Sequence, residues 1–487
     1  MRKNPVIPML VPIVLSGMLA ACGGGEDGNP NAGDASINYT TSRLGMSGGF
    51  VDVNGDGKKD LIVGAPEARA SSKKAGVATI YLAGQDGAID EKASSVLEGE
   101  GEGDFFGFSF TNLGDVNGDS KNDFAIGALN AEGEAGISGA VYVYKGGENP
   151  PVLLAKLKGL NAFDKFGYSI ASGDVNGDGL KDILVSSPHT FNEDYQSGVV
   201  SVYFGGESIA EKADVMIRGD KVNASVGQAV ASGDINGDNI DDIIMDVSAK
   251  VYIYYGGADI KTRIAEDVTP NVKIRSDSGR HGGSGFGYAL AYAGDVDGDG
   301  VGDIAVGNPR RSNPATYDSS GSFYIFKGGK DLPAEFYEDN TDYRLVKVAG
   351  ADMDDHLGSF IRNAGDVDNG GKPDFLVGAN WANGGDDGKK MITGNIFLFH
   401  GEDLVVSKPE EDQSITLAKY SFPMGESSSE YGGAIDSDGH LIFSGTPGAN
   451  KHDGGYVLTY VHDGKSVVVD EKASNASADA DPHAAHH

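Results

Sequence analysis

Short runs of apolar residues recur along the chain, and six of them come directly after a loop rich in Asp, Asn and Gly. The third loop, residues 174–182, reads Asp-Val-Asn-Gly-Asp-Gly-Leu-Lys-Asp and continues into the apolar segment 183–185. Short apolar runs bounded by such residues are typical of β-strands, and no stretch shows sustained helical periodicity. The pattern therefore predicts an all-β protein.

Each loop carries oxygen-bearing side chains at its positions 1, 3, 5 and 9. This spacing suits calcium, which takes about six to eight oxygen ligands. Carboxylates that converge in one turn would repel one another without a counter-ion. We therefore expect about five structural calcium ions, one in each of the first five loops. The predicted ligands are Asp52, Asn54, Asp56 and Asp60; Asp115, Asn117, Asp119 and Asp123; Asp174, Asn176, Asp178 and Asp182; Asp234, Asn236, Asp238 and Asp242; and Asp295, Asp297, Asp299 and Asp303.

The sixth loop departs from this pattern because Gly370 stands at position 5. It keeps Asp366, Asp368 and Asp374, and whether it binds calcium is left open. An EF-hand is excluded, since its loop ends in a bidentate Glu at position 12, where all six copies here carry an apolar residue.

The loop belongs to a larger repeat of about sixty residues. Loop starts are separated by 63, 59, 60, 61 and 71 residues. A strand that begins Phe-Gly precedes most loops, as at 106–110, 166–170 and 286–290, and Val226 and Leu357 replace Phe in two copies. A Gly-Ala-Pro segment follows the first loop at 64–66, with related segments at 186–188 and 307–309. A third strand then alternates apolar and aromatic residues up to a Gly-Gly turn, as at 141–147.

A seventh copy is visible near the C-terminus, at 431–460, where the loop has shrunk to 436–439. We expect no comparable ion site there. Residues 37–470 are 434 positions, or 62 for each of seven units. Four short strands per unit, repeated radially, protect the edges of the sheets. The sequence thus predicts a seven-bladed β-propeller of four-stranded antiparallel blades with calcium-binding loops.

The Phe-Gly strand, the Asp-rich loop and the Gly-Ala-Pro segment together resemble the FG-GAP repeats of the integrin α-subunit propeller and its bacterial relatives. The resemblance implies that each calcium loop joins the first and second strands of a blade on a lower face, and that ligands bind on the opposite, upper face. Nothing in the chain resembles the integrin stalk, transmembrane helix or β-subunit partner. Animal-type cell adhesion is therefore not carried over.

The N-terminal segment has the pattern of an export signal, with Arg2 and Lys3 before an apolar run to Ala21. Its end, Leu-Ala-Ala-Cys at 19–22, resembles a bacterial lipobox, which implies that Cys22 is lipidated. Gly23 then favours the outer membrane, on its periplasmic or cell-surface side. We expect a signal peptide at 1–21, a flexible tether at 22–36, the propeller at 37–470 and a disordered tail at 471–487.

The chain is strongly acidic, with a formal net charge of −33. This charge argues against nucleic acid and anionic membrane surfaces as partners. We expect a monomeric propeller that meets the membrane only through its N-terminal lipid.

The upper face should carry any ligand site, and aromatic and arginine side chains are typical contacts for proteins and sugars. Packing beneath their own loops is the alternative. The candidates are His189 and Tyr195 in blade three, Arg310, Arg311 and Tyr317 in blade five, and Trp381 in blade six.

The leading functional hypothesis is a non-enzymatic, calcium-stabilised propeller that binds a protein or glycan partner in adhesion or envelope organisation. A polysaccharide lyase or hydrolase and a scaffolding subunit of an envelope complex are the alternatives, since propellers also host enzymes. The many carboxylates leave room for a glycosidase pair, but the sequence singles none out.

Overall fold

The computed structural model describes most of the chain between residues 43 and 468. The described ranges are 43–70, 73–85, 87–90, 92–192, 195–219, 226–266, 268–276, 285–311, 319–350, 355–367, 369–380, 395–404, 421–423, 435–437, 441–446, 456–462 and 467–468. The predicted signal peptide, tether and tail, and Cys22 with them, lie outside these ranges.

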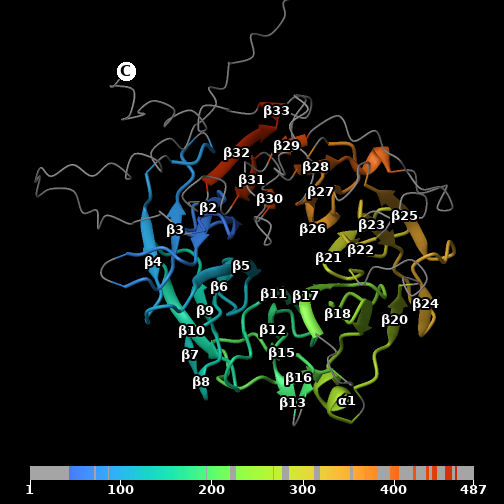
Figure 1. The fold of residues 1–487 in the computed structure, drawn as a ribbon, viewed down its shortest axis with the longest axis horizontal. Coiled ribbons are helices and arrows are strands. Elements are labelled where there is room, and N and C mark those ends of the chain that lie inside the picture. The colour runs from blue at the N-terminus through green and yellow to red at the C-terminus, as the bar shows by residue number, and fades with distance from the viewer. Residues whose placement is uncertain are drawn as a thin grey trace, which may run out of the picture.

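The strands form separate sheets that stand around a common centre (Figure 1). The first contains β1 (Ser47–Val51), β2 (Asp60–Ala65), β3 (Val77–Tyr81) and β4 (Ser95–Glu98); the second β5 (Phe106–Gly114), β6 (Asp123–Ala128), β9 (Ala140–Lys145) and β10 (Val152–Lys158); the third β11 (Ile170–Gly173), β12 (Asp182–Ser187), β15 (Val199–Tyr203) and β16 (Val215–Arg218). Two small hairpins project from the second and third sheets: β7 (Glu132–Gly133) with β8 (Gly136–Ile137), and β13 (Phe191–Asn192) with β14 (Tyr195–Gln196).

The second half of the ring repeats this arrangement. The fourth sheet contains β17 (Val226–Gly233), β18 (Asp242–Val247), β19 (Lys250–Tyr254) and β20 (Val272–Arg275); the fifth β21 (Leu290–Gly294), β22 (Asp303–Asn308), β23 (Ser322–Phe326) and β25 (Arg344–Ala349); the sixth β26 (Leu357–Gly365), β27 (Asp374–Ala379), β28 (Asn395–Phe399) and β29 (Ser421–Pro423). A further sheet joins β30 (Ile435–Ser437), β31 (Leu441–Thr446), β32 (Tyr456–His462) and β33 (Val467–Val468).

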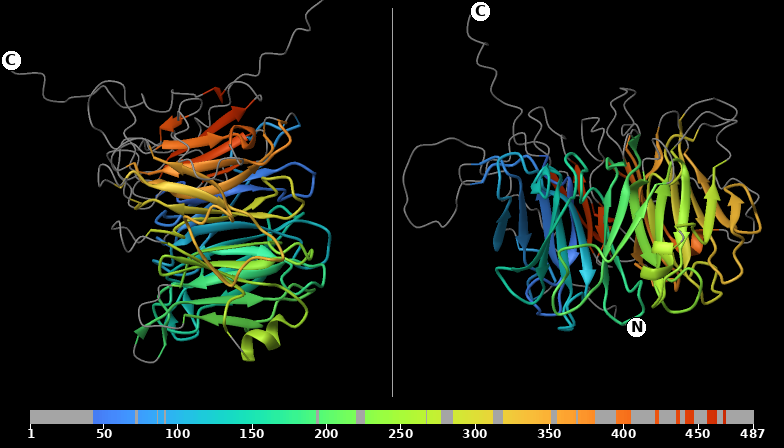
Figure 2. Two further views of the ribbon diagram at one scale, coloured as in Figure 1. Left: turned by 90° about the vertical axis from the view of Figure 1, so that its right-hand side faces the viewer. Right: turned by 90° about the horizontal axis from the view of Figure 1, so that it is seen from below.

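The architecture is an all-β propeller of antiparallel sheets, as predicted. In Figure 1 the strands β5, β11, β17, β21 and β26 lie nearest the centre and β4, β10 and β20 toward the rim. Figure 2 shows the strands running between the two faces of the ring, where the loops lie. Six blades are described with buried side chains, rather than the seven that the repeat predicts; for the sheet β30–β33 the backbone is described.

Blade four departs from the predicted four antiparallel strands. Its outer strand β20 pairs in parallel with β24 (Glu335–Tyr337), which belongs to the segment between β23 and β25 of blade five. A seven-residue helix, α1 (Ile260–Glu266), follows β19 and buries Ile260 and Ile264. The helix is too short for the sequence periodicity to reveal it. None of the helices in the described ranges is long and apolar enough to cross a membrane.

The hydrophobic core lies between neighbouring blades. Alternate residues of a strand point to opposite faces of a sheet, so each blade contributes one set of side chains to each neighbour. Between blades two and three, for example, Val141 and Val143 of one blade pack with Ile183, Val185 and Tyr203 of the next. Each of the five interfaces between the six blades with described side chains is one such core cluster.

The two halves of the sequence repeat meet across these interfaces. A Cβ on Gly64, in the Gly-Ala-Pro segment of blade one, would lie 2.2 Å from the carbonyl oxygen of Gly107, in the Phe-Gly segment of blade two. The same approach recurs at Gly307, whose Cβ would lie 2.1 Å from the carbonyl oxygen of Gly358. Only glycine allows backbones so close. The Phe-Gly and Gly-Ala-Pro motifs therefore belong to one contact between adjacent blades.

Candidate cation-binding loops

The six Asp-rich loops all join the first and second strands of their blades, and so lie on one face of the ring, the lower face. Position 9 of each loop is the first residue of the second strand. This placement agrees with the one that the family resemblance implies. It sets the loops on the face opposite the turns between second and third strands.

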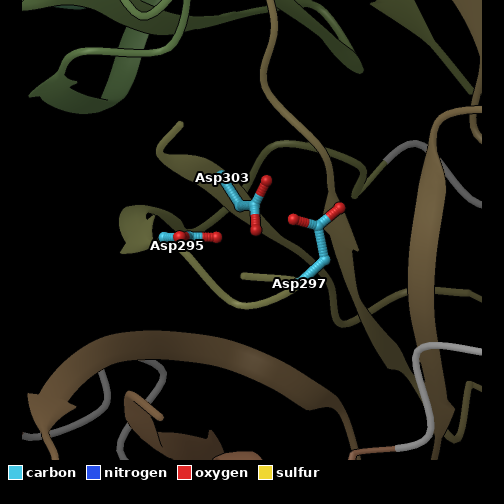
Figure 3. A group of neighbouring side chains, drawn as sticks. All are labelled: Asp295, Asp297 and Asp303. Atoms are coloured by element: carbon cyan, nitrogen blue, oxygen red, sulfur yellow. The ribbon is translucent and has the colours of Figure 1, made fainter. Parts of the chain in front are cut away.

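The fifth loop brings three carboxylates together. Oxygen atoms of Asp295, Asp297 and Asp303 all lie within 4.8 Å of one another (Figure 3). Asp303 is fully buried, and its burial raises its pKa to about 7, with Asp297 and Asp299 adding to the rise. Burial of Asp297, followed by the charge of Asp299, raises the pKa of Asp297 as well. Such a group of oxygen donors fits a hard cation.

The carboxylate at position 1 organises the loop around itself. Asp295 accepts N–H hydrogen bonds from Gly298 at 2.7 Å, Asp299 at 3.0 Å and Gly300 at 2.8 Å. The same three bonds recur in the first four loops, on Asp52, Asp115, Asp174 and Asp234. The backbone is thus wrapped in the same way five times.

The carboxylate at position 9 fixes the loop to the rest of its blade. One oxygen accepts the N–H of position 2, and the other accepts an N–H just after the third strand. These bonds join Asp60 to Val53 and Ala83, Asp123 to Val116 and Gly146, Asp182 to Val175 and Gly205, Asp242 to Ile235 and Gly256, Asp303 to Val296 and Gly328, and Asp374 to Val367 and Gly401.

Burial also raises the pKa of the position-9 carboxyls in the first four loops. The pKa rises to about 6 at Asp60 and Asp123 and to about 7 at Asp182 and Asp242, although the backbone N–H groups partly offset the rise. A buried carboxylate that resists ionisation is stabilised as the anion by a bound cation.

The loops are also tied to the following blade. The N–H of Gly206, in the Gly-Gly turn of blade three, donates to the carbonyl of Val116 in the loop of blade two at 2.8 Å. Gly257 donates in the same way to Val175 at 2.9 Å, and Gly329 to Ile235 at 2.7 Å. The Gly-Gly turns that the sequence shows therefore hold the loop of the preceding blade.

The sixth loop is described except for one residue. Asp366 accepts an N–H from Gly371 at 2.9 Å, and Asp368 lies outside the described residues. The side chain of His400 lies beside this loop, with its Nδ1 3.5 Å from Asp374 Oδ1.

Of the predicted ligand-binding residues, the structure describes the side chains of His189, Arg310 and Arg311, which lie on blades three and five. Arg310 is exposed on the upper-face turn after β22, whereas Arg311 points inward and forms an ion pair with the buried carboxylate of Glu338. Of the two candidate arginines, Arg310 is therefore the exposed one. His189 lies on the turn after β12, where desolvation and the nearby charge of Lys165 lower its pKa. The structure gives only the backbone of Tyr195, and Tyr317 and Trp381 lie outside the described residues.

Sequence reasoning missed a buried carboxylate two residues before the Phe-Gly strand. Asp104 accepts an N–H from Gly101 at 2.7 Å, and Asp164 accepts one from Asn161 at 2.8 Å. Asp355 occupies the same place before blade six and is also buried. The recurring spacing Asp-x-Phe-Gly, with Leu for Phe in the third case, was the signal available.

The residues of this repeat match a known family. The profile described as "FG-GAP repeat" matches residues 44–81, 106–144, 166–203 and 286–326. The chain is a β-propeller that carries FG-GAP repeats. The four matched segments each run from a first strand through the Asp-rich loop to a third strand.

Relatives of this FG-GAP propeller include integrin α-subunits and a phospholipase. It is 31% identical to integrin alpha-V of Gallus gallus over 45% of this chain and 20% of the relative, and 32% identical to integrin alpha pat-2 of Caenorhabditis elegans over 45% and 18%. It is 29% identical to phosphatidylinositol-glycan-specific phospholipase D of Bos taurus over 41% of this chain and 26% of the relative. The chain thus spans about a quarter or less of the length of these relatives.

Proposed function

We propose that this FG-GAP propeller is a calcium-stabilised binding domain. The convergence of Asp295, Asp297 and Asp303 within 4.8 Å is the observation that carries the proposal. Calcium would be held by the carboxylates and amides at positions 1, 3, 5 and 9, with the backbone carbonyl of position 7. The ion would supply positive charge that offsets the carboxylates and fixes the turn.

The proposal extends to about five ions, because the wrapped backbone and the buried position-9 carboxylate recur in the first five loops. Each such loop is bonded to its own third strand, and the first four are also bonded to the next blade. A cation bound there would therefore stiffen the joint between blades as well as the loop.

We also propose that the ring has seven blades. The sheet β30–β33 supports this count, because β30 contacts both β1 of the first blade and β26 of the sixth. In that arrangement the last sheet closes the circle between them.

For the cellular role, we propose a lipoprotein of the outer membrane, anchored through Cys22, that binds a protein or glycan. Integrins and a phospholipase are both similar to this chain. What they share with it is therefore better explained by a common fold than by a common reaction. This argument favours binding over catalysis. The proposed lipid anchor also agrees with the net charge of −33, because an acidic protein is not attracted to an anionic membrane surface.

Thermal unfolding with calcium and with a chelator tests the proposal. Ions that bind only the folded state raise its melting temperature by mass action. We expect the melting temperature to fall on chelation and to recover when calcium is restored. An unchanged melting temperature would contradict a structural role for calcium.

A further inference from the structure

The third and fourth Asp-rich loops, residues 174–182 and 234–242 (loops three and four), are joined by a residue that is not among their predicted ligands. This residue is Asp241, at position 8 of loop four. Its backbone N–H donates to the carbonyl of Asp174, at position 1 of loop three, at 3.0 Å. Its Oδ2 accepts the N–H of Asp174 at 2.8 Å. One predicted ligand of loop three is therefore fixed by two hydrogen bonds to a single residue of loop four.

Asp241 also carries an ion pair across the same joint. The Nζ of Lys181, at position 8 of loop three, lies 2.7 Å from Asp241 Oδ2. The side chain of Asp241 is 20% exposed, so the contact is partly shielded from solvent. Hydrogen bonds with a charged partner are stronger than neutral ones. The carboxylate of Asp241 thus accepts two hydrogen bonds from loop three, one of them from a charged donor.

Asp241 lies between two predicted ligand positions of its own loop. Ile240, at position 7, would offer its backbone carbonyl, and Asp242, at position 9, its carboxylate. A cation in loop four would therefore hold residues 240–242 in place, and Asp241 with them. Without a cation the carboxylates of the loop repel one another, which loosens the loop. The contact with Asp174 should thus be firmer when loop four is occupied.

The next joint, between loop four and loop five (residues 295–303), lacks these bonds. Its position 8 is Gly302, which has no side chain to accept a hydrogen bond. Among the described residues no backbone hydrogen bond joins Gly302 to Asp234, at position 1 of loop four. The ring of Tyr292 lies there instead, since a Cβ on Gly302 would be 2.2 Å from Tyr292 Cε2. Loops four and five therefore serve as a comparison for loops three and four.

We propose that Asp241 couples loops three and four, so that calcium bound in one loop raises the affinity of the other. A loop that its neighbour has already ordered loses less conformational entropy when it binds, which makes binding cooperative. The effect is reciprocal, because a coupling free energy belongs to both sites. The inference rests on the proposed calcium-binding function and assigns to it one cooperative pair of sites.

Two variants, each with two of the first five loops intact, test this inference. Asp→Ala at position 5 removes an exposed side chain that is a predicted ligand of its loop. The first variant, with Asp56→Ala, Asp119→Ala and Asp299→Ala, keeps loops three and four. The second, with Asp56→Ala, Asp119→Ala and Asp178→Ala, keeps loops four and five. Both keep the sixth loop, so any ion bound there is common to the two variants.

Calcium titration in competition with a chromophoric chelator gives the affinities of the ions that each variant binds. In the first variant we expect the second ion to bind about five-fold or more tightly than independent sites allow. In the second variant we expect binding close to that of independent sites. Independent or anticooperative binding in the first variant, or equal cooperativity in both variants, would overturn the inference.

Substitution of Asp241 within the first variant locates the coupling. Asp241→Ala removes the acceptor for Asp174 and Lys181 but no predicted ligand, so we expect loops three and four still to bind calcium, now without cooperativity. Lys59→Ala is the matched control, since Lys59 is exposed at position 8 of the first loop, and it should leave the cooperativity unchanged. Cooperativity that persists in Asp241→Ala would overturn the inference. If Asp241→Ala does not fold, the comparison of the two loop pairs still tests the coupling.

The same titrations separate this inference from the calcium proposal. If both variants bind calcium at independent sites, the coupling fails and the calcium proposal stands. If neither variant nor the wild-type protein binds calcium, the calcium proposal fails and the coupling fails with it.

Discussion

Asp182 and Gly205 are joined by a hydrogen bond of 2.9 Å, from the backbone N–H of Gly205 to Oδ1 of Asp182. The other oxygen of Asp182 accepts the N–H of Val175, also at 2.9 Å. One buried carboxylate therefore connects the Asp-rich loop to the end of the third strand. It serves the fold and offers a ligand to a cation at the same time.

Replacing Asp182 should destabilise the protein with or without calcium. Asp182→Ala removes the charged acceptor of two buried N–H groups, and each such bond contributes about 1.5 to 3 kcal/mol. We expect a loss of a few kcal/mol in the free energy of unfolding, measured by denaturant titration in chelator.

Asp178→Ala is the comparison for that experiment. Asp178 is an exposed position-5 side chain that accepts the N–H of Leu180 within its own loop. The substitution Asp178→Ala should lower the free energy of unfolding mainly when calcium is present. Equal losses for both variants in chelator would contradict the separate roles given to the two positions.

The stabilisation by calcium should depend on pH. Burial raises the pKa of Asp182, Asp242 and Asp303 to about 7, against about 3.9 for an unfolded Asp. Between these values the cation-free folded state binds more protons than the unfolded state, so its stability falls as pH rises. Calcium needs the ionised carboxylates.

Scanning calorimetry at about pH 5 and about pH 8 checks this prediction. The rise in melting temperature caused by calcium should be larger at the higher pH. The cation-free protein should melt lower there than at the lower pH. A calcium effect that is equal or smaller at the higher pH would contradict the assignment of these carboxylates as ligands.

Much of the fold could be predicted from the sequence because the repeat is regular. The alternation along 141–144 and the Asp spacing of 174–182 specify strand, loop and strand in order. The parallel addition of β24 to β20 could not be predicted, since it depends on how residues 335–337 cross to another blade. Sequence periodicity carries no information about such a crossing.

The candidate site was predictable to a similar degree. Residue spacing located the loops, because their ligands are close in sequence. The sequence offers Arg311 as a ligand-binding candidate beside Arg310 and leaves packing beneath its loop open, because its partner Glu338 lies in a segment that the repeat does not describe.

The glycines at the blade interfaces should tolerate no side chain. Gly307→Ala would place a Cβ 2.1 Å from the carbonyl oxygen of Gly358, a backbone atom with little freedom to move. We expect a loss of about 1 to 3 kcal/mol in stability, as for other overpacked sites. In blade three Ser186 stands at the equivalent place, so Ser186→Ala should cost less in the same denaturant titration. Equal losses of stability in Gly307→Ala and Ser186→Ala would contradict the close contact between Gly307 and Gly358.

Arg311 and Arg310 should behave in opposite ways. Arg311→Ala leaves the buried Glu338 without its ion-pair partner, which typically destabilises a protein by about 3 to 5 kcal/mol. Arg310→Ala changes an exposed side chain and should alter stability by less than about 0.5 kcal/mol. Denaturant unfolding of the two variants measures both losses of stability. An unchanged free energy of unfolding in Arg311→Ala would show that the buried ion pair contributes nothing to the stability of the fold.

The number of calcium ions bound by each chain tests the central claim most directly. Protein stripped with chelator and dialysed against calcium, with the bound metal measured by atomic emission, should hold about five ions per chain. The substitution Asp295→Ala should remove one of them. A content of none or one in the wild-type protein would contradict the account of the loops as cation sites.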